Sequence, residues 1–250
     1  MRVPVSVALA AYNGERFIVA QLRSILAQLG AEDEVVVVDD ASTDRTCALI
    51  GQLGDSRIRL LRQTINQGVR TAFGRALGAA TGDIVFLSDQ DDLWLAGKRE
   101  ALVRVLADTP GAVLALSDAQ VIDAEGAVTG ASFMRLRGGF RGGLFDTLVK
   151  NRFLGCAMAF RRELLARVLP IPAGVPMHDM WIGALAACSG RVVYVDRPLM
   201  QYRRHGGNLS PASPAGLSTM LRWRWSLLAN VVLRIASTPR IAVNRAAPNR

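Results

Sequence analysis

The sequence predicts an α/β protein with a doubly wound, mostly parallel sheet flanked by helices and a helical appendage at its C-terminal end. Apolar runs of strand length alternate with apolar residues at helical spacing from the N-terminus onward. Two of these runs, Val35–Val38 and Ile84–Leu87, are apolar on both faces, as in parallel strands covered by helices on both sides. With 250 residues, 50% of them hydrophobic, the chain can bury a large core, which excludes a disordered or fibrous protein.

The first ninety residues or so fit four β-α steps. We expect strands followed by helical segments with apolar residues three or four positions apart. In chain order these are strand Val5–Leu9, a helix from Phe17 to Leu29, strand Val35–Val38, a helix at Ala48–Ile50, strand Ile58–Leu61, a helix at Ala72–Leu77 and strand Ile84–Leu87.

After Asp92 the pattern changes to mixed strands, loops and helices. We expect helix Lys98–Ala107, strand Val113–Leu116, a hairpin over Val121–Val128, a glycine-rich loop at Arg137–Gly143, helix Arg162–Val168, a helix opening near His178 and strand Val192–Val195. The only stretch with linker composition is Pro211–Gly216. The organisation predicted is one domain over 1–208, with a nucleotide-type half (1–92) and an acceptor-type half (93–208), and a basic segment over 209–250.

The net charge of +9 is distributed unevenly. All 21 acidic residues lie in 1–196, where basic residues balance them, whereas 197–250 contains nine arginines and no acidic residue. A nucleic-acid-binding surface is usually spread over the fold, so this pattern argues against a nucleic-acid partner. An anionic membrane is the more common partner for a basic terminal segment.

The cysteines and the N-terminus favour a cytoplasmic protein. Cys47, Cys156 and Cys188 are far apart and form no CxxC pair, which argues against a disulfide framework and a structural zinc site. The N-terminal segment reaches Asn13, Gly14 and Glu15 after a short apolar run, so the apolar core of a signal peptide is missing. We also expect no membrane span, because no window has roughly 18 consecutive apolar residues.

Carboxylates are concentrated where two predicted strands end. Asp39 and Asp40 follow the second strand, and Asp89, Asp91 and Asp92 follow the fourth. Ligands of open α/β sheets bind at the carboxyl ends of the strands, and like charges so close together need neutralisation. Hard oxygen ligands suit Mg²⁺ or Mn²⁺. The alternative for the segment after Asp40 is a helix cap formed by Ser42 or Thr43 with Asp44, and for the segment at Asp89 it is a solvated loop.

Four motifs in order resemble the inverting family 2 glycosyltransferases over roughly residues 3–208. They are Val5–Glu15 with Tyr12-Asn13-Gly14-Glu15, Val35–Asp40 with Ala41–Thr46, Asn66-Gln67-Gly68, and Phe86–Trp94 with Ser88-Asp89-Gln90-Asp91-Asp92. The resemblance implies a GT-A fold and a nucleoside diphosphate sugar donor. Members with Ser-Asp-Gln-Asp-Asp before an apolar residue and Trp are often rhamnosyltransferases, which favours dTDP-rhamnose as donor and a UDP-sugar second.

The resemblance also assigns site residues. Asp40 would bind the pyrimidine base with Ala10, Tyr12 and Glu15, while Asp89 and Asp91 match the DxD that contacts ribose and metal. The residues implied for the nucleotide-sugar are Ala10, Tyr12, Asn13, Glu15, Asp40, Asn66, Gly68, Asp89, Arg203 and Arg204; those for Mg²⁺ or Mn²⁺ are Asp91, Asp92 and His205. Ala41 departs from the family, where Gly is usual, and this changes a turn rather than a ligand.

An inverting transfer requires a general base that takes the proton of the acceptor hydroxyl. The candidate is Asp179 in Met177-His178-Asp179-Met180-Trp181, and the alternative is that Asp179 caps a helix. The acceptor implied is a saccharide or a lipid-linked saccharide in cell-surface polysaccharide synthesis. Two other functions stay open: a haloacid-dehalogenase-like phosphatase that uses the DxD, and a non-enzymatic basic nucleic-acid-binding protein.

The basic segment contains a predicted amphipathic helix. Leu221, Trp225, Leu228, Val232 and Ile235 recur at a spacing of three or four and define one apolar face. Tryptophan and arginine without acidic residues are typical of a helix that lies at a membrane interface, and a core or oligomerisation helix shows the same spacing. We therefore expect peripheral attachment to the cytoplasmic face of an anionic membrane through residues 219–236.

Overall fold

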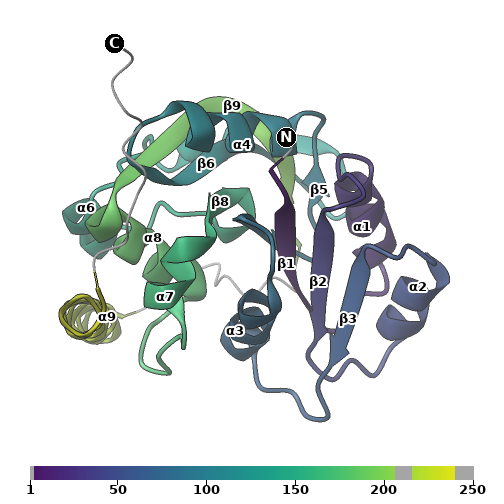
Figure 1. The fold of residues 1–250 in the computed structure, drawn as a ribbon, viewed down its shortest axis with the longest axis horizontal. Helices are drawn as coiled ribbons and strands as arrows, with labels where there is room; N and C mark the ends of the chain where they lie inside the picture. Colours follow the sequence, from purple (N-terminus) through teal and green to yellow (C-terminus); the bar gives the residue numbers. More distant parts are fainter. Residues whose placement is uncertain (1–2, 206–215, 240–250) are drawn as a thin grey trace.

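The computed structural model describes residues 3–205 and 216–239 and contains one curled mixed sheet with helices on both faces (Figure 1). The strand order is β3-β2-β1-β4-β8-β6-β9-β5, and β7 pairs with β6. The strands are β1 (Val5–Ala11), β2 (Glu34–Asp39), β3 (Ile58–Arg62), β4 (Ile84–Asp89), β5 (Leu93–Trp94), β6 (Ala112–Ile122), β7 (Val128–Gly130), β8 (Met158–Arg161) and β9 (Arg191–Arg203).

The parallel part of the sheet is the part that the sequence predicted best. Strands β3, β2, β1 and β4 are mutually parallel, and β6 is parallel to β9. Strand β8 is antiparallel to both β4 and β6, and β5 and β7 are antiparallel additions. The doubly wound α/β class is therefore confirmed. The second half of the chain contributes more antiparallel strands than the first. The sequence did not predict this, because an apolar run does not encode the direction of its strand.

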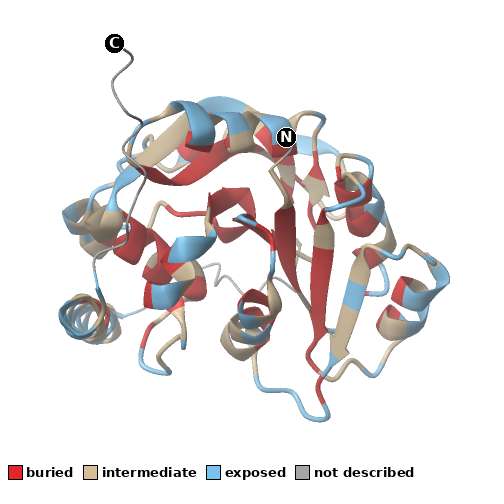
Figure 2. Cartoon of the chain, in the orientation of Figure 1, coloured by how far each residue is buried: buried red, intermediate tan, exposed pale blue. Residues whose placement is uncertain are grey.

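Helices cover the two faces of the sheet and form two cores. One core contains Ile18 and Leu22 of α1 (Ile18–Leu26) with Leu102 of α4 (Lys98–Asp108), and α2 (Thr46–Gln52) packs at its edge. The other contains Phe73 of α3 (Val69–Ala79) and Trp181 of α8 (His178–Ser189). The central strands β1, β2 and β4 are buried on both faces, as their unbroken apolar runs predicted (Figure 2).

The segment between the strands of the second half contains short helices that the sequence did not predict. These are α5 (Phe133–Leu136) and α6 (Leu144–Val149), separated by the glycine-rich loop, in which Gly138 and Gly139 have positive φ. The predicted hairpin is present, with β6 and β7 joined by a turn in which Asp123 accepts the Ala127 amide at 2.8 Å. A short 3₁₀ turn, η1 (Gly155–Ala157), leads into β8, and η2 (Arg162–Leu164) and α7 (Leu165–Val168) follow it.

The predicted C-terminal helix is present as α9 (Leu217–Ser237), and it packs beside α6 and α8. Among its described side chains, Leu227 and Val231 are buried. On the predicted apolar line, Ile235 is partly buried against the core, whereas Trp225 is 70% exposed and Val232 is 58% exposed. The linker expected at Pro211–Gly216 lies almost wholly outside the described residues. Among the helices described, none combines the length and apolar character that crossing a membrane requires.

Candidate active site

The carboxyl ends of β1, β2 and β4 meet at one edge of the sheet because these neighbouring strands are parallel. A cavity of about 350 Å³ opens there, and the start of α8 and the η1 turn close its other side. Eight residues that the sequence singled out line it: Ala10, Tyr12, Asp40, Asn66, Gly68, Asp89, Asp91 and Asp179. Residues from both halves of the sequence thus share one cavity.

Asp40 organises the loop that forms one wall of the cavity. One of its oxygens accepts the Gln67 amide at 2.8 Å and also the side-chain amide of Gln63, and the other accepts the Gly68 amide at 2.8 Å. Asp40 is only 3% exposed. The next residue, Ala41, has φ +63°, so the backbone keeps here a conformation that favours glycine although the residue is alanine.

Asn13 and Glu15 hold the loop after β1 against the loop after β2 and do not line the cavity. The Asn13 side chain accepts the Thr43 amide at 2.9 Å, and Glu15 accepts the Arg45 amide at 3.1 Å. The expected cap formed by Ser42 or Thr43 is absent from α2, because Ser42 accepts the Asn13 amide instead. Asp44 bonds the Thr46 amide of the first turn at 2.9 Å, as expected.

Gln90 is a site residue that the sequence analysis missed. It lies between Asp89 and Asp91, lines the cavity, and forms two reciprocal bonds with the backbone of Tyr12: the Tyr12 amide donates to its Oε1 at 2.8 Å, and its Nε2 donates to the Tyr12 carbonyl at 2.9 Å. These two bonds between Gln90 and Tyr12, the Gln90–Tyr12 clasp, join the loops after β1 and β4. A neutral amide between aspartates carries no sequence signal of its own, which is why it was missed.

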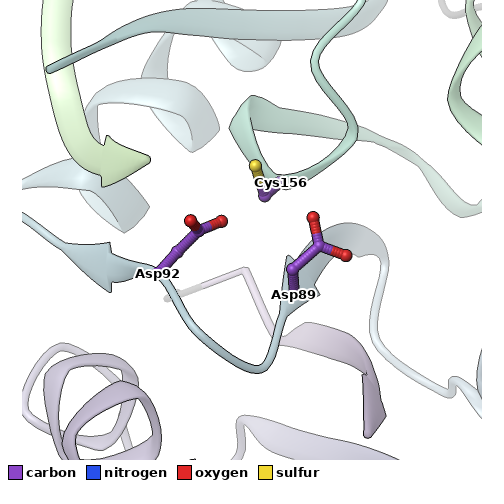
Figure 3. A group of neighbouring side chains, drawn as sticks. All are labelled: Asp89, Asp92 and Cys156. Carbon is purple, nitrogen blue, oxygen red and sulfur yellow. The ribbon is translucent and has the colours of Figure 1, made fainter. Parts of the chain in front are cut away.

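The carboxylates of Asp89 and Asp92 point into one space, beside the thiol of Cys156 on the η1 turn (Figure 3). One ligand atom from each of these three residues lies within 4.8 Å of the other two. Burial, followed by the charges of the neighbouring aspartates, raises the pKa of Asp89 well above its usual range. The same causes raise the pKa of Asp92 to about 7. The cluster therefore resists full ionisation in the absence of a cation.

This donor set fits a hard divalent cation. Asp92 Oδ1 accepts the Arg203 amide at 2.9 Å, whereas Asp92 Oδ2 is buried and has no hydrogen-bond partner among the residues that the structure describes. Carboxylate oxygens are the ligands that Mg²⁺ and Mn²⁺ prefer. Burial raises the pKa of the Cys156 thiol well above its usual range, so Cys156 remains a neutral thiol and is a poor ligand for such an ion.

A buried lysine lies behind the acidic cluster. The side chain of Lys98, at the start of α4, is fully buried, and its Nζ donates to the Cys156 carbonyl at 2.5 Å and lies 4.4 Å from the centre of the Trp94 ring. Burial lowers its pKa to about 8, while the charges of Asp92 and Asp89 act in the opposite direction. Lys98 supplies part of the counter-charge of the cluster from the side away from the cavity.

His205, Arg203 and Arg204 lie beside the cluster and do not line the cavity. His205 Nε2 is 2.8 Å from Asp91 Oδ2, which brings together two of the residues predicted to hold the metal. The Arg203 side chain donates to the Asp91 carbonyl at 2.8 Å and to the Asp123 carbonyl at 2.9 Å, and it stacks over the Phe17 ring. Arg204 is exposed, and its amide donates to the Ile122 carbonyl.

Asp179 lies in the first turn of α8 and faces the cavity opposite the strand ends. Its Oδ1 accepts the Met180 amide at 2.6 Å, and Asn151 Nδ2 lies 3.4 Å from both of its carboxylate oxygens. The alternative that Asp179 caps the helix is wrong, because the N-cap of α8 is Met177 and makes no side-chain cap bond, whereas Asp179 lies within the first turn. Burial raises the pKa of Asp179 to about 6, in spite of these bonds.

The neighbouring His178 is buried, and its ring stacks on Phe73 with centroids 4.0 Å apart. Burial lowers its pKa to about 3, so it stays neutral near pH 7. A separate hollow of about 430 Å³, lined in part by Asp118, Ser132 and Asp196, contains none of the predicted site residues. The carboxyl groups whose pKa values are strongly raised, Asp89, Asp92 and Asp179, lie in or beside the cavity at the strand ends.

Comparison with known proteins identifies a family whose sequence model matches most of this chain. The Glycosyl transferase family 2 model matches residues 6–169. An uncharacterised glycosyltransferase of Nostoc sp. is 30% identical over 216 residues, which cover 82% of this chain and 66% of that protein. WfgD of Escherichia coli, a UDP-Glc:alpha-D-GlcNAc-diphosphoundecaprenol beta-1,3-glucosyltransferase, is 36% identical over 102 residues, which cover 41% of this chain and 40% of that protein. The alignments thus span less than two thirds of each of these curated relatives.

Two solved structures have the same fold. TarS of S. aureus (residues 1–349, in complex with UDP-GlcNAc) superposes with a TM-score of 0.70 at 20% identity and covers 94% of this chain and 67% of that one. A mannosyltransferase of Pyrobaculum calidifontis, in complex with GDP-Man and Mn²⁺, gives a TM-score of 0.64 at 24% identity and covers 98% of this chain and 68% of that one. These similarities confirm the GT-A type of fold expected from the sequence.

Proposed function

The chain belongs to glycosyl transferase family 2, and on this basis we propose that it is an inverting glycosyltransferase that moves a sugar from a nucleoside diphosphate sugar to a saccharide or lipid-linked saccharide. The observation that carries the proposal is a single cavity lined by Asp40, the acids after β4 and Asp179. Neither alternative function has comparable support, because the matched family segment includes the DxD that the phosphatase alternative needed.

The donor occupies the side of the cavity formed by the strand ends. Asp40 and Tyr12 contact the base, and Asn66 and Gly68 lie beside them on the wall that Asp40 holds in place. Asp89 contacts the ribose at the end of β4. Asn13 and Glu15 act on the nucleotide through the loop that they hold, since their side chains bond the backbone of Thr43 and Arg45.

Asp89, Asp91 and Asp92 are the residues that would hold Mg²⁺ or Mn²⁺, with His205 placed on Asp91. Bound there, such an ion would supply positive charge against the diphosphate leaving group. The buried Asp92 Oδ2 without a hydrogen-bond partner supports this assignment. The solved mannosyltransferase with Mn²⁺ supports a divalent cation in this fold. Of the two arginines proposed for the diphosphate, Arg204 is exposed, whereas Arg203 bonds the Asp91 carbonyl.

Asp179 takes the proton of the acceptor hydroxyl. The side chain lines the same cavity as Asp40 and Asp89, so an acceptor hydroxyl bound in this cavity lies within its reach. Its pKa of about 6 leaves it mostly ionised near pH 7 and basic enough to accept a proton. Asn151 contacts both of its oxygens and orients the carboxylate.

The acceptor proposed is a saccharide or a lipid-linked saccharide in cell-surface polysaccharide synthesis. The name of WfgD describes transfer to a sugar carried on diphosphoundecaprenol, which supports this acceptor class. A membrane-borne acceptor also agrees with peripheral attachment to the inner face of the cytoplasmic membrane through residues 219–236, where α9 exposes Trp225 and Val232.

Rhamnose, carried on dTDP, is the favoured donor because of the Ser88–Asp92 motif, and a UDP-sugar is second. The test is a panel of nucleoside diphosphate sugars incubated with the protein and Mg²⁺ or Mn²⁺, with release of the nucleoside diphosphate as the readout. We expect release from one donor class and its loss in EDTA. Release of phosphate from phosphomonoesters, with no turnover of any sugar nucleotide, would contradict the proposed reaction.

A further inference from the structure

Helix α9 packs on the domain through one face and leaves another apolar face uncovered. Leu227 and Val231 are buried, and the Arg234 side chain donates to the carbonyls of Arg167 and Leu169 at 2.7 Å. On the other face Leu221 is 46% exposed, Trp225 is 70% exposed and Val232 is 58% exposed. These three residues are spaced four and seven positions apart, so they lie along one stripe of the helix.

Helix α6 extends this stripe with apolar side chains of its own. Phe145 is 77% exposed and Val149 is 54% exposed, and their spacing of four places both on one face of α6. The two helices are in contact, and Arg224 of α9 donates to the carbonyl of Val149 at 2.6 Å. This bond joins α9 to the C-terminal end of α6, so the exposed side chains of the two helices belong to neighbouring elements of the fold.

We propose that Phe145 and Val149 of α6, together with Leu221, Trp225 and Val232 of α9, form one docking surface for an anionic lipid bilayer. Phe145 and Trp225 are its main anchors. The proposal rests on the proposed function in one respect, namely that the acceptor is membrane-borne, and it adds an element, α6, to which the sequence analysis gave no role.

The charge around this α6–α9 surface selects a bilayer over a second copy of the chain. Lys150 and Arg222 are exposed at its border and Arg224 lies where the two helices meet, whereas the only acidic residue of the two helices is the half-buried Asp146 of α6. A symmetric contact between two copies would place this positive charge against itself, whereas anionic headgroups neutralise it. Trp and Phe side chains at the level of the headgroups with arginines beside them are typical of interfacial attachment.

The α6–α9 surface continues to the candidate base. Lys150 and Asn151 follow the end of α6 directly, and Asn151 contacts both carboxylate oxygens of Asp179. In this proposal, docking through α6 holds Asn151 and Asp179 near the bilayer, where the saccharide of a lipid-linked acceptor is located. Membrane docking would explain why α6 exposes apolar side chains close to the candidate base.

The test compares binding of the full chain to vesicles of phosphatidylglycerol and phosphatidylcholine by co-sedimentation. The variants are Phe145→Ser, Trp225→Ser and the double variant, and Val128→Ser, which changes a 52% exposed valine on β7, is the matched control. We expect each anchor variant to lower vesicle affinity about tenfold, and the double variant to lower it further. The Val128→Ser variant should bind as the unchanged chain does, and high salt should weaken all binding.

Three outcomes would overturn the proposal. They are absence of binding by the unchanged chain, loss of binding on Trp225→Ser without any effect of Phe145→Ser, and a dimer in vesicle-free solution that the anchor variants dissociate. Turnover with a water-soluble acceptor is measured in parallel on every variant. Retained turnover with lost vesicle binding supports the surface, whereas absent turnover in the unchanged chain contradicts the proposed function and leaves the vesicle result to be judged separately.

Discussion

Asp179 combines the two properties that a general base needs, namely access to the cavity and a raised pKa. Burial raises this pKa to about 6, and the bonds from Met180 and Asn151 prevent a larger rise. The carboxylate accepts a proton only when it is ionised, so activity depends on the fraction that is ionised at each pH.

The pH profile of the unchanged enzyme should reflect this group. With donor and cation present, we expect kcat/KM to fall about tenfold for each pH unit below about 6 and to level off above it. The measurement is nucleoside diphosphate release from about pH 5 to about pH 8, with stability checked at each pH. A profile that is flat down to about pH 5 would contradict a base with this pKa.

The ionisation of Asp92, beside the buried Lys98, affects the free energy of unfolding of the protein. The pKa of Asp92 rises from 3.8 to about 7 in the folded protein, so between these values the folded state binds more protons than the unfolded state. Stability from this group is therefore complete below about pH 4 and is lost as the pH rises through about 7. Lys98 limits that loss because it places a positive charge behind the cluster.

Replacing Asp92 should therefore stabilise the protein when no divalent cation is present. In EDTA at about pH 8, we expect Asp92→Asn to raise the free energy of unfolding by roughly 2 kcal/mol, because a buried charge is removed from the cluster. Asp108→Asn, at an exposed aspartate of α4, is the control. Denaturant unfolding measures the difference, and equal or lower stability of Asp92→Asn would contradict the charge assignment.

The loops after β1 and β4 act as one element because Gln90 joins them. A Cβ atom on Gly14 would lie 2.3 Å from Gln90 Oε1, so a side chain at this position forces Gln90 away and breaks both bonds to Tyr12. Since Tyr12 lines the cavity, the loop that contacts the base loses its support.

Gly14→Ala should weaken donor binding about tenfold while stability falls by only about 1 kcal/mol. Gln90→Ala should have a similar effect, and the double variant should be little worse than either, because both changes remove the same clasp. Gly74→Ala in α3, where a Cβ meets nothing within 4 Å, is the control. Calorimetric titration of the nucleoside diphosphate measures the affinity, and fully additive losses would show that Gly14 and Gln90 act independently.

The elements that the sequence predicted correctly are those with long and regular patterns. Strands β1, β2 and β4 appear as unbroken apolar runs because they are buried on both faces, and the acids after them mark the edge at which the cavity opens. Helices α5 and α6 span four and six residues, which is too short for helical periodicity to appear. Gln90, Asn151 and Lys98 were missed because a single amide or lysine gains its role only from tertiary contacts.

At the scale of the whole molecule, the fold brings together two halves of the sequence that contribute different chemistry. Residues up to Asp92 supply the strand ends that hold Asp40 and the acidic cluster, and the later residues supply Asp179 and the α6–α9 surface. The predicted boundary at 208 lies outside the described residues, and α9 packs on the domain rather than standing apart from it. The division into 1–208 and 209–250 therefore remains a prediction about the chain and not an observed separation.

The central claim is that Asp179 acts as the base in a transfer whose donor is held by the acids after β4. The most direct measurement compares donor binding and nucleoside diphosphate release in Asp179→Asn and Asp91→Ala, with Mn²⁺ present. We expect Asp179→Asn to bind the donor normally and to lose turnover by about a hundredfold or more, and Asp91→Ala to lose cation-dependent donor binding. Retention of most of the turnover by Asp179→Asn would contradict the account.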